Sequence, residues 1–299
     1  MIRSMWSAVS GLRNHQTYLD VTGNNIANVN THGYKATRAV FEDSLSQTIR
    51  NAAAPRTGGT SGDIGGVNPT QVGLGVRLGQ ISGDFKQGGL QVTNVPTDMA
   101  LQGDGFFVVK KGTQEFYTRN GAFSLDKEGN LVTGDGSYVM GFQKSTDADT
   151  AVANAKTLSA IKIPVWKAGG TNADGSAAAG TGYTSWQVSP DGTVTGFNPD
   201  KPAGEVIAVI GVSRFNNPQG LDRVGGSMFR PTLNSGDPSI TGADRAGAGQ
   251  IIQNTLELSN VDLAGEFTNL IMAQRGFQAN SKVVSASDEV LQDLINMKR

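Results

Sequence analysis

The side chains that most often catalyse reactions are scarce in this sequence. The 299 residues include two histidines, His15 and His32, and no cysteine. The lack of cysteine excludes disulfide bonds, thiol catalysis and cysteine-ligated metal sites. A Ser–His–Asp triad would have to take its histidine from the N-terminal region, where both histidines lie. The sequence therefore predicts no catalytic residues and no enzyme activity.

Two short motifs resemble ligand-binding loops but lack essential parts. Residues 73–79 read Gly-Leu-Gly-Val-Arg-Leu-Gly, one residue too long for a dinucleotide-binding loop, and no helical pattern follows. Asp147-Ala148-Asp149 could begin a calcium-binding loop, but the glycine and glutamate required downstream are absent. Any two of the 26 acidic residues could meet in space as a glycosidase pair, and no spacing singles out such a pair. We expect no cofactor and no bound metal.

The charge and hydropathy patterns argue against two classes of partner. Lysine and arginine total 25 against 26 acidic residues, which gives a net charge of -1. Binding to nucleic acid or to an anionic membrane needs clustered positive charge, and no cluster is present. The longest wholly apolar stretch, residues 206–210, is far shorter than the roughly 20 residues of a membrane-spanning helix. The N-terminus lacks the apolar core and cleavage site of a secretory signal, so the sequence predicts no cleaved signal peptide of the ordinary kind.

Glycine and proline are distributed unevenly, which divides the chain into helical ends and a β-rich interior. All ten prolines lie between Pro55 and Pro238, and only four of the 40 glycines fall within residues 1–30 and 255–299. Between the ends, short stretches of alternating residues are separated by turn residues such as Gly103-Asp104-Gly105. The fold class is therefore mainly β, with outer β domains and terminal α-helices that form a coiled-coil-like inner domain.

Apolar residues recur every seven positions in both ends. The N-terminal row is Met5, Leu12, Leu19 and Ile26 with Val9 beside it, and the C-terminal row is Leu263, Leu270, Phe277, Val284 and Leu291. A second C-terminal row, Phe267, Gln274, Ser281, Asp288 and Ile295, is polar in its middle. One interpretation is two amphipathic helices on a globular core. The narrow stripes favour a coiled-coil seam instead, in which the ends pair with each other and with neighbouring copies.

The predicted domains are nested. Residues 1–30 and 255–299 form a terminal helical polymerisation domain, and residues 31–70 form an extended connector. Residues 71–145 and 206–254 form a β domain, into which a small β domain of residues 146–205 is inserted.

Several separated motifs resemble those of one protein family. Residues 23–35, Gly-Asn-Asn-Ile-Ala-Asn-Val-Asn-Thr-His-Gly-Tyr-Lys, and the C-terminal stretches 259–263 and 270–277 resemble the paired signatures of bacterial flagellar rod and hook axial proteins. Residues 103–107, 116–121 and 129–132 resemble the shared β domain of that family. Within the family, residues 68–76, 94–99 and 288–296 favour the short hook proteins of Gram-positive type. The distal rod protein is the alternative, because residues 1–6 resemble its opening.

The resemblance implies a structural subunit that self-assembles into a helical, hollow homopolymer. The subunit would be exported unfolded through the flagellar type III apparatus to an extracellular hook. The hook is a flexible universal joint that transmits torque from motor to filament, whereas a distal rod is a rigid drive shaft. The implied partners are the chain itself, the distal rod protein, and the hook cap and hook–filament junction proteins.

We predict subunit-interface residues in both ends. They are Met5, Val9, Leu12, Leu19, Asn24, Asn25, Ile26 and Asn28, with Leu263, Phe267, Leu270, Gln274, Phe277, Val284, Leu291 and Ile295. A secreted carbohydrate-binding module or glycosidase is the alternative from a different class. It requires a pocket lined by aromatic residues, and residues 146–205 supply only Trp166, Tyr183, Trp186 and Phe197.

Overall fold

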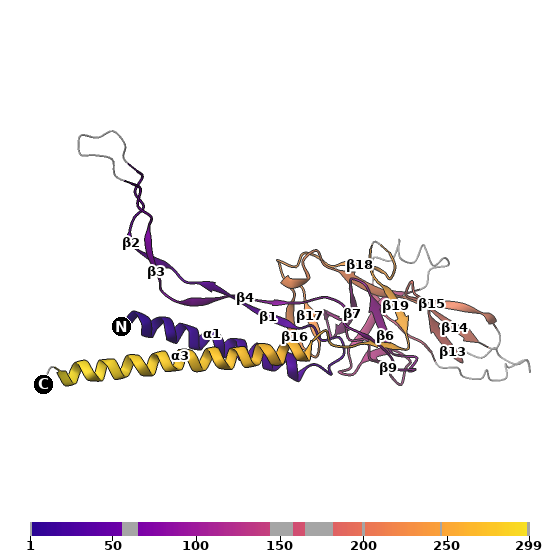
Figure 1. Ribbon diagram of the computed structural model, residues 1–299. Helices are drawn as coiled ribbons and strands as arrows, with labels where there is room; N and C mark the ends of the chain where they lie inside the picture. Colours follow the sequence, from indigo (N-terminus) through magenta and orange to yellow (C-terminus); the bar gives the residue numbers. More distant parts are fainter. Residues whose placement is uncertain are drawn as a thin grey trace, which may run out of the picture. The chain divides into compact units, whose positions relative to one another are not determined.

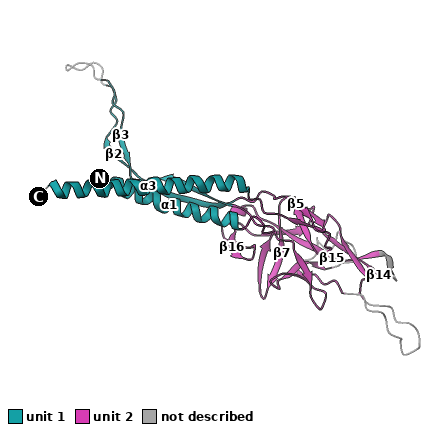
Figure 2. Ribbon diagram, turned by 60° about the horizontal axis from the view of Figure 1, so that its bottom comes forward, with its two compact units in different colours: residues 1–27, 37–83, 262–299 teal, residues 28–36, 84–261 magenta. Residues whose placement is uncertain are grey.

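The computed structural model describes residues 2–55, 65–143, 158–164, 182–198, 201–245 and 247–297. The chain divides into two units, each built from segments far apart in the sequence (Figure 2). Unit 1 comprises Met1–Ala27, Thr37–Gly83 and Asp262–Arg299, and unit 2 comprises Asn28–Ala36 and Asp84–Val261. Each unit thus needs residues from both halves of the sequence.

Unit 1 is built on two long helices, α1 (Ile2–Ala27) and α3 (Leu263–Met297), which lie side by side in Figures 1 and 2. The prediction of helical ends is therefore confirmed. The second helix begins at Leu263, inside the predicted helical domain of residues 255–299. Asp262 caps it: its side-chain oxygen accepts a hydrogen bond from the backbone N–H of Ala264 at 3.1 Å. None of the helices in the described ranges has the length and apolar character needed to cross a membrane.

Strands occupy much of the segment for which the sequence predicts an extended connector. β1 (Thr37–Asp43) pairs antiparallel with β4 (Val76–Gly83), and β2 (Ser46–Arg50) pairs with β3 (Thr70–Gly73). The correction has a physical reason in β1: Phe41 packs edge-on against Tyr18 of α1, with ring centroids 5.6 Å apart. Residues 71–83 accordingly belong to unit 1 rather than to the β domain.

Unit 2 is dominated by a twelve-stranded sheet, ordered β13-β14-β15-β11-β7-β8-β17-β16, with β9, β10, β12 and β18 joined at its sides. The described strands of this unit are β5 (Leu90–Val92), β6 (Met99–Gln102), β7 (Phe106–Lys111), β8 (Gln114–Thr118), β9 (Phe123–Leu125), β10 (Leu131–Thr133), β11 (Tyr138–Gln143), β12 (Ser159–Ala160), β13 (Ser185–Val188), β14 (Thr193–Asn198), β15 (Lys201–Arg214), β16 (Asp222–Gly225), β17 (Met228–Arg230), β18 (Ser239–Gly242), β19 (Gln250–Gln253) and β20 (Thr255–Glu257). Two further pairs, β19 with β6 and β20 with β5, bring the end of the unit back to its beginning.

The described part of the predicted insert, residues 146–205, does not form a sheet of its own. β14 pairs with β15, in a register that places Thr193 opposite Val209, and β15 in turn pairs with β11. Apolar side chains explain this arrangement, because Val188 and Val194 are buried in the same core cluster as Phe107 and Ile210. Residues 146–157, 165–181 and 199–200 of the predicted insert lie outside the described residues.

A second core cluster surrounds Tyr117, which is buried and lies 4.8 Å from Phe215 between ring centroids. Burial, and to a lesser extent the charge of Glu115, raises the pKa of Tyr117 to about 12. A raised tyrosine pKa gives stability that is fully present below the unfolded-state pKa of about 10 and is lost as pH rises through 12.

We therefore expect Tyr117→Phe to flatten the loss of unfolding free energy between pH 10 and 12. The difference from the native chain should reach roughly 1–3 kcal/mol, at about 1.4 kcal/mol per unit of pKa. Denaturant unfolding at pH 8, 10 and 12 measures it. Parallel pH profiles for the two proteins would contradict this assignment.

Candidate subunit-interface site

Small residues bring α1 and α3 close together. Ala8 and Gly11 of α1 and Ala273 of α3 are buried. A Cβ added to Gly11 would lie 2.7 Å from Asn280 Nδ2, and one added to Gly276 would overlap the ring of His15. Residue 11 thus faces residue 280 and residue 15 faces residue 276, so the helices run antiparallel. This pairing within one chain is the frame on which any interface between copies would be built.

The predicted N-terminal row lies on the inner side of α1. Met5, Leu12, Leu19 and Ile26 are half-buried, as is Val9. On α3, Leu270, Val284 and Leu291 of the first predicted row are also half-buried. Leu263 and Phe277 of that row are exposed. The sevenfold rows are thus largely half-buried, whereas the contacts described between the two helices join Gly11 with Asn280 and His15 with Gly276.

The second predicted row on α3 points away from α1 in the isolated chain. Phe267 is 51% exposed, Gln274 is exposed and Ile295 is 70% exposed. The row one residue earlier is less exposed and carries small or polar side chains: Glu266, Ala273, Asn280 and Ser287. One residue turns a helix by about 100°, and Ala273 and Gly276 allow a closer approach than Phe267 and Gln274 would. That Phe267, Gln274 and Ile295 contact another copy stays a prediction.

Asn25, one of the predicted interface residues, makes three hydrogen bonds to other residues of unit 1. Its side chain donates to the backbone carbonyl of Thr37 at 2.8 Å and to Glu266 Oε1 at 3.0 Å, and its Oδ1 accepts from the N–H of Thr37 at 3.0 Å. It thus ties α1 to β1 and to α3. Asn28 lies in unit 2, where its Oδ1 accepts from the hydroxyl of Thr31 at 3.1 Å, and Asn24 is exposed.

Unit 1 presents two surfaces to solvent, an apolar one and a mostly polar β ribbon that carries a few exposed apolar side chains. The first lies along α3 and comprises Leu263, Phe267, Ile271, Met272, Phe277, Val283, Val290, Leu294, Ile295 and Met297. The second is the β2–β3 ribbon, in which every strand residue is exposed, beside Leu45 at 80% exposure. Monomeric proteins rarely expose large apolar patches, and an isolated two-stranded ribbon is marginally stable in water. Both surfaces are therefore suited to being covered by other chains.

Unit 2 contains a buried charge node that sequence reasoning missed. Lys35 Nζ donates to Glu257 Oε1 at 2.7 Å and to the carbonyl of Lys86 at 2.7 Å. Arg119 Nη1 lies 3.3 Å from Glu257 Oε2 and donates to the carbonyl of Leu101 at 3.1 Å. The side chains of Lys35 and Glu257 are fully buried. The signal was present in β20, where Glu257 stands between two leucines in a strand.

Burial dominates the electrostatics of this node. It lowers the pKa of Lys35, and the charge of Glu257 opposes that effect without cancelling it. Burial likewise lowers the pKa of Arg119, again opposed first by Glu257. Glu257 is thus the carboxylate that both desolvated cations share, and Asp104 adds a smaller effect at Arg119. Loss of Glu257 would remove the main compensating charge of each cation. The node joins the N-terminal segment 33–35, the segment 86–88 and β20.

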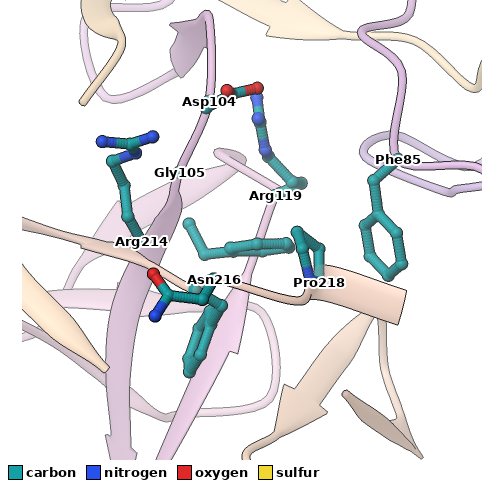
Figure 3. Close-up of a pocket in the computed structure, with 9 residues that line it drawn as sticks. Phe85, Asp104, Gly105, Arg119, Arg214, Asn216 and Pro218 are labelled. Carbon is teal, nitrogen blue, oxygen red and sulfur yellow. The ribbon is translucent and has the colours of Figure 1, made fainter. Parts of the chain in front are cut away.

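A cavity of about 200 Å³ in unit 2 adjoins the node and is lined by Phe85, Asp104, Gly105, Phe106, Arg119, Arg214, Phe215, Asn216 and Pro218 (Figure 3). Figure 3 shows the carboxylate of Asp104 and the guanidinium of Arg119 turned toward each other. No histidine lines this cavity, and its aromatic walls belong to the core around Phe106 and Phe215. Across the described ranges, no three His, Asp or Glu side chains gather as a metal site.

Two of the aromatic residues that a carbohydrate site would need, Tyr183 and Trp186, take part in packing instead. The ring of Tyr183 covers Gly196 so closely that an added Cβ there would overlap it. Trp186 packs, half-buried, against the main core cluster. Trp166 lies outside the described residues. Tyr183 and Trp186 therefore do not form the open aromatic platform of a sugar-binding module.

Three family models match segments in this order along the chain. The flagella basal body rod protein model matches residues 5–35, the flagellar hook protein FlgE/F/G D1 domain model matches residues 100–196, and the flagellar basal body rod FlgEFG C-terminal model matches residues 252–297. Two of these models match the segments that contain α1 and α3, and the third matches part of unit 2. Together they define the class as a flagellar axial protein.

Full-length relatives narrow that class. The flagellar basal-body rod protein FlgG of Bacillus subtilis (strain 168) is 41% identical over 300 residues, with 100% of both chains covered. FlgG of Borreliella burgdorferi is 34% identical over 301 residues, again with 100% of both chains covered. The flagellar hook protein FlgE of the same organism is 27% identical over 447 positions, with 100% of both chains covered. The chain belongs to the flagellar rod and hook protein family.

Proposed function

We propose that this chain is a structural subunit of the flagellar rod, of the distal FlgG type. The relation of chain lengths is the observation that carries this proposal. Alignment with the rod protein of Bacillus subtilis needs 300 positions for a chain of 299 residues. Alignment with the hook protein of Borreliella burgdorferi needs 447, so a long stretch of that hook protein has no counterpart here. The hook, which the sequence motifs favoured, becomes the second candidate.

A structural rather than an enzymatic role fits the site. The chain has two histidines and no cysteine, and the charged cluster of Lys35, Arg119 and Glu257 is buried. The exposed apolar rows of α3 would be covered by other copies, at roughly 25 cal/mol for each Å² removed from water. Export through the flagellar type III apparatus and contacts with neighbouring axial proteins belong to the same proposal.

The β2–β3 ribbon supports a stiff polymer. A ribbon that is exposed on both faces gains stability only by packing on another surface, and in a polymer the nearest surfaces are neighbouring subunits. Contacts of this kind add a link between copies beyond the terminal helices. A shaft with such additional links resists bending more than one held by its inner helices alone.

Polymerisation of the purified chain tests the proposal. We expect straight tubes in negative-stain electron microscopy, because the ribbon links neighbouring subunits. A variant in which residues 46–73 are replaced by Asn-Gly should form tubes that bend visibly more. The design is local, because the N–H of Leu74 already donates to the carbonyl of Leu45 at 3.1 Å and a two-residue Asn-Gly turn can close such a ribbon.

The rod and the hook predict different shapes of tube in the electron micrographs. Curved tubes from the native chain would favour the hook, and the absence of any polymer would contradict both. The control for the deletion replaces Ile49 and Val72 by threonine, which keeps the ribbon and removes its apolar side chains. If that variant bends as much as the deletion, apolar contacts carry the stiffness; if neither bends, the ribbon does not link subunits.

A further inference from the structure

The last turns of α3 extend past the end of α1. Residue 11 faces residue 280 and residue 15 faces residue 276. Since both helices rise by the same amount per residue, Ile2 stands level with Glu289. Figures 1 and 2 both show the C-terminal part of α3 continuing alone beyond the start of α1. We call residues 290–297 the α3 overhang.

The α3 overhang carries the apolar side of α3 into a region where α1 no longer covers it. Val290, Leu294, Ile295 and Met297 are all exposed. On a helical wheel Leu291 and Leu294 lie on the face that meets α1 earlier in the helix, at Ala273 and Ser287, and the other three residues extend this apolar face to either side. Asp288 and Asp293 flank this face on its two sides. A surface that binds this face would need apolar residues to cover its apolar side chains and a positively charged residue at its edge to pair with a flanking aspartate.

Unit 1 also contains a groove with those properties. Trp6, Val9, Ser10, Arg13 and Asn14 of α1 and Val76, Arg77 and Leu78 of β4 line a space of about 270 Å³. Trp6 is 64% exposed. Because tryptophan is among the residues that most often anchor interfaces, its exposure makes this groove suited to a partner. Arg77 already pairs with Glu42 at 3.0 Å, whereas exposed Arg13 has no carboxylate partner among the described residues. We call this the α1–β4 groove.

We propose that the α3 overhang of one copy docks in the α1–β4 groove of a second copy, with Asp293 next to Arg13. This inference rests on the proposed assembly of the chain into a polymer. The two surfaces match in kind: an apolar helix face with a flanking carboxylate meets an apolar floor with a flanking guanidinium. Because overhang and groove are different surfaces, each copy offers one of each, and the contact propagates rather than closing a dimer.

Cross-linking tests the contact directly, because the cysteine-free chain gives no background. The variant Val9→Cys with Leu294→Cys, polymerised and treated with a short bismaleimide, should give a ladder of covalent multimers on a denaturing gel. Val9→Cys with Gln292→Cys is the matched control, since Gln292 lies on the opposite side of the same helical turn. It should give at least about tenfold less ladder.

Charge reversal provides the second measurement. Arg13→Glu should raise the critical concentration for polymerisation about tenfold, and Asp293→Arg in the same chain should restore it to within about threefold. Polymers that form without a ladder from Val9→Cys with Leu294→Cys overturn the docking proposal and leave the rod proposal standing. The absence of polymers from the native chain overturns both. A ladder together with charge rescue supports the contact.

Discussion

Glu257→Ala should lower the free energy of unfolding of unit 2 by about 3–5 kcal/mol, because it leaves Lys35 and Arg119 buried without their shared carboxylate. Thermal or denaturant unfolding followed by near-ultraviolet circular dichroism would measure the loss. The same substitution also frees the N–H of Gly88, which donates to Glu257 Oε1 at 2.9 Å. Few single changes on this chain remove as many interactions between distant segments.

Asp222→Ala is the matched control for this prediction. It also deletes one carboxylate from an ion pair in unit 2, with Arg230 at 2.6 Å, but both side chains are about half exposed. An exposed pair is worth at most about 1 kcal/mol. Lys35→Met added to Glu257→Ala should recover part of the stability, since it removes one uncompensated cation. Equal losses from Glu257→Ala and Asp222→Ala would contradict the role of the node.

Gly276→Leu should separate α1 from α3, with a loss of about 3 kcal/mol. Even a Cβ at this position overlaps the His15 ring, and larger side chains force packed helices apart. Helix propensity does not explain the loss, because leucine favours helices by nearly 1 kcal/mol over glycine. Unfolding followed at 222 nm reports the helix pair, and the critical concentration for polymerisation reports its consequence for assembly.

Gly23→Leu separates the packing effect from the backbone effect. Gly23 lies in α1, is exposed, and an added Cβ would meet nothing within 4 Å. Leucine there should leave stability unchanged or raise it by up to about 1 kcal/mol. His15→Ala combined with Gly276→Leu should recover part of the loss by making room for the side chain. If Gly23→Leu is as damaging as Gly276→Leu, close helix approach is not the cause.

Periodicity alone does not identify the faces on which α1 and α3 meet. In α1, the apolar row of Met5, Leu12, Leu19 and Ile26 is half-buried, but Gly11 and His15, which meet α3, lie outside it. In α3, apolar residues cover more of the circumference, and the repeat does not distinguish a side that meets α1 from one left for another copy. The choice depends on Ala273 and Gly276, whose small size rather than hydropathy sets the approach of the two helices.

Local sequence patterns do not predict which distant segments of the chain pair with each other. The turn-rich residues 31–70 have few apolar positions, and β1 is held by the packing of Phe41 on α1 and its ladder with β4. The buried node is hidden for a similar reason. Lys35, Arg119 and Glu257 lie far apart in the sequence. The leucines beside Glu257 are a local sign of its burial, but no local pattern pairs it with the two cations.

The Lys35–Glu257 ion pair also sets an order of events in time. Its two residues are separated by 222 positions, so it cannot form until most of the sequence is free to fold. A chain delivered N-terminus first would lack the contacts of residues 33–35 with Glu257 until β20 emerges. Contacts between such distant residues slow folding, because a long loop must close before they contribute. The node therefore delays the completion of unit 2: in a partly delivered subunit, unit 2 cannot reach its final fold.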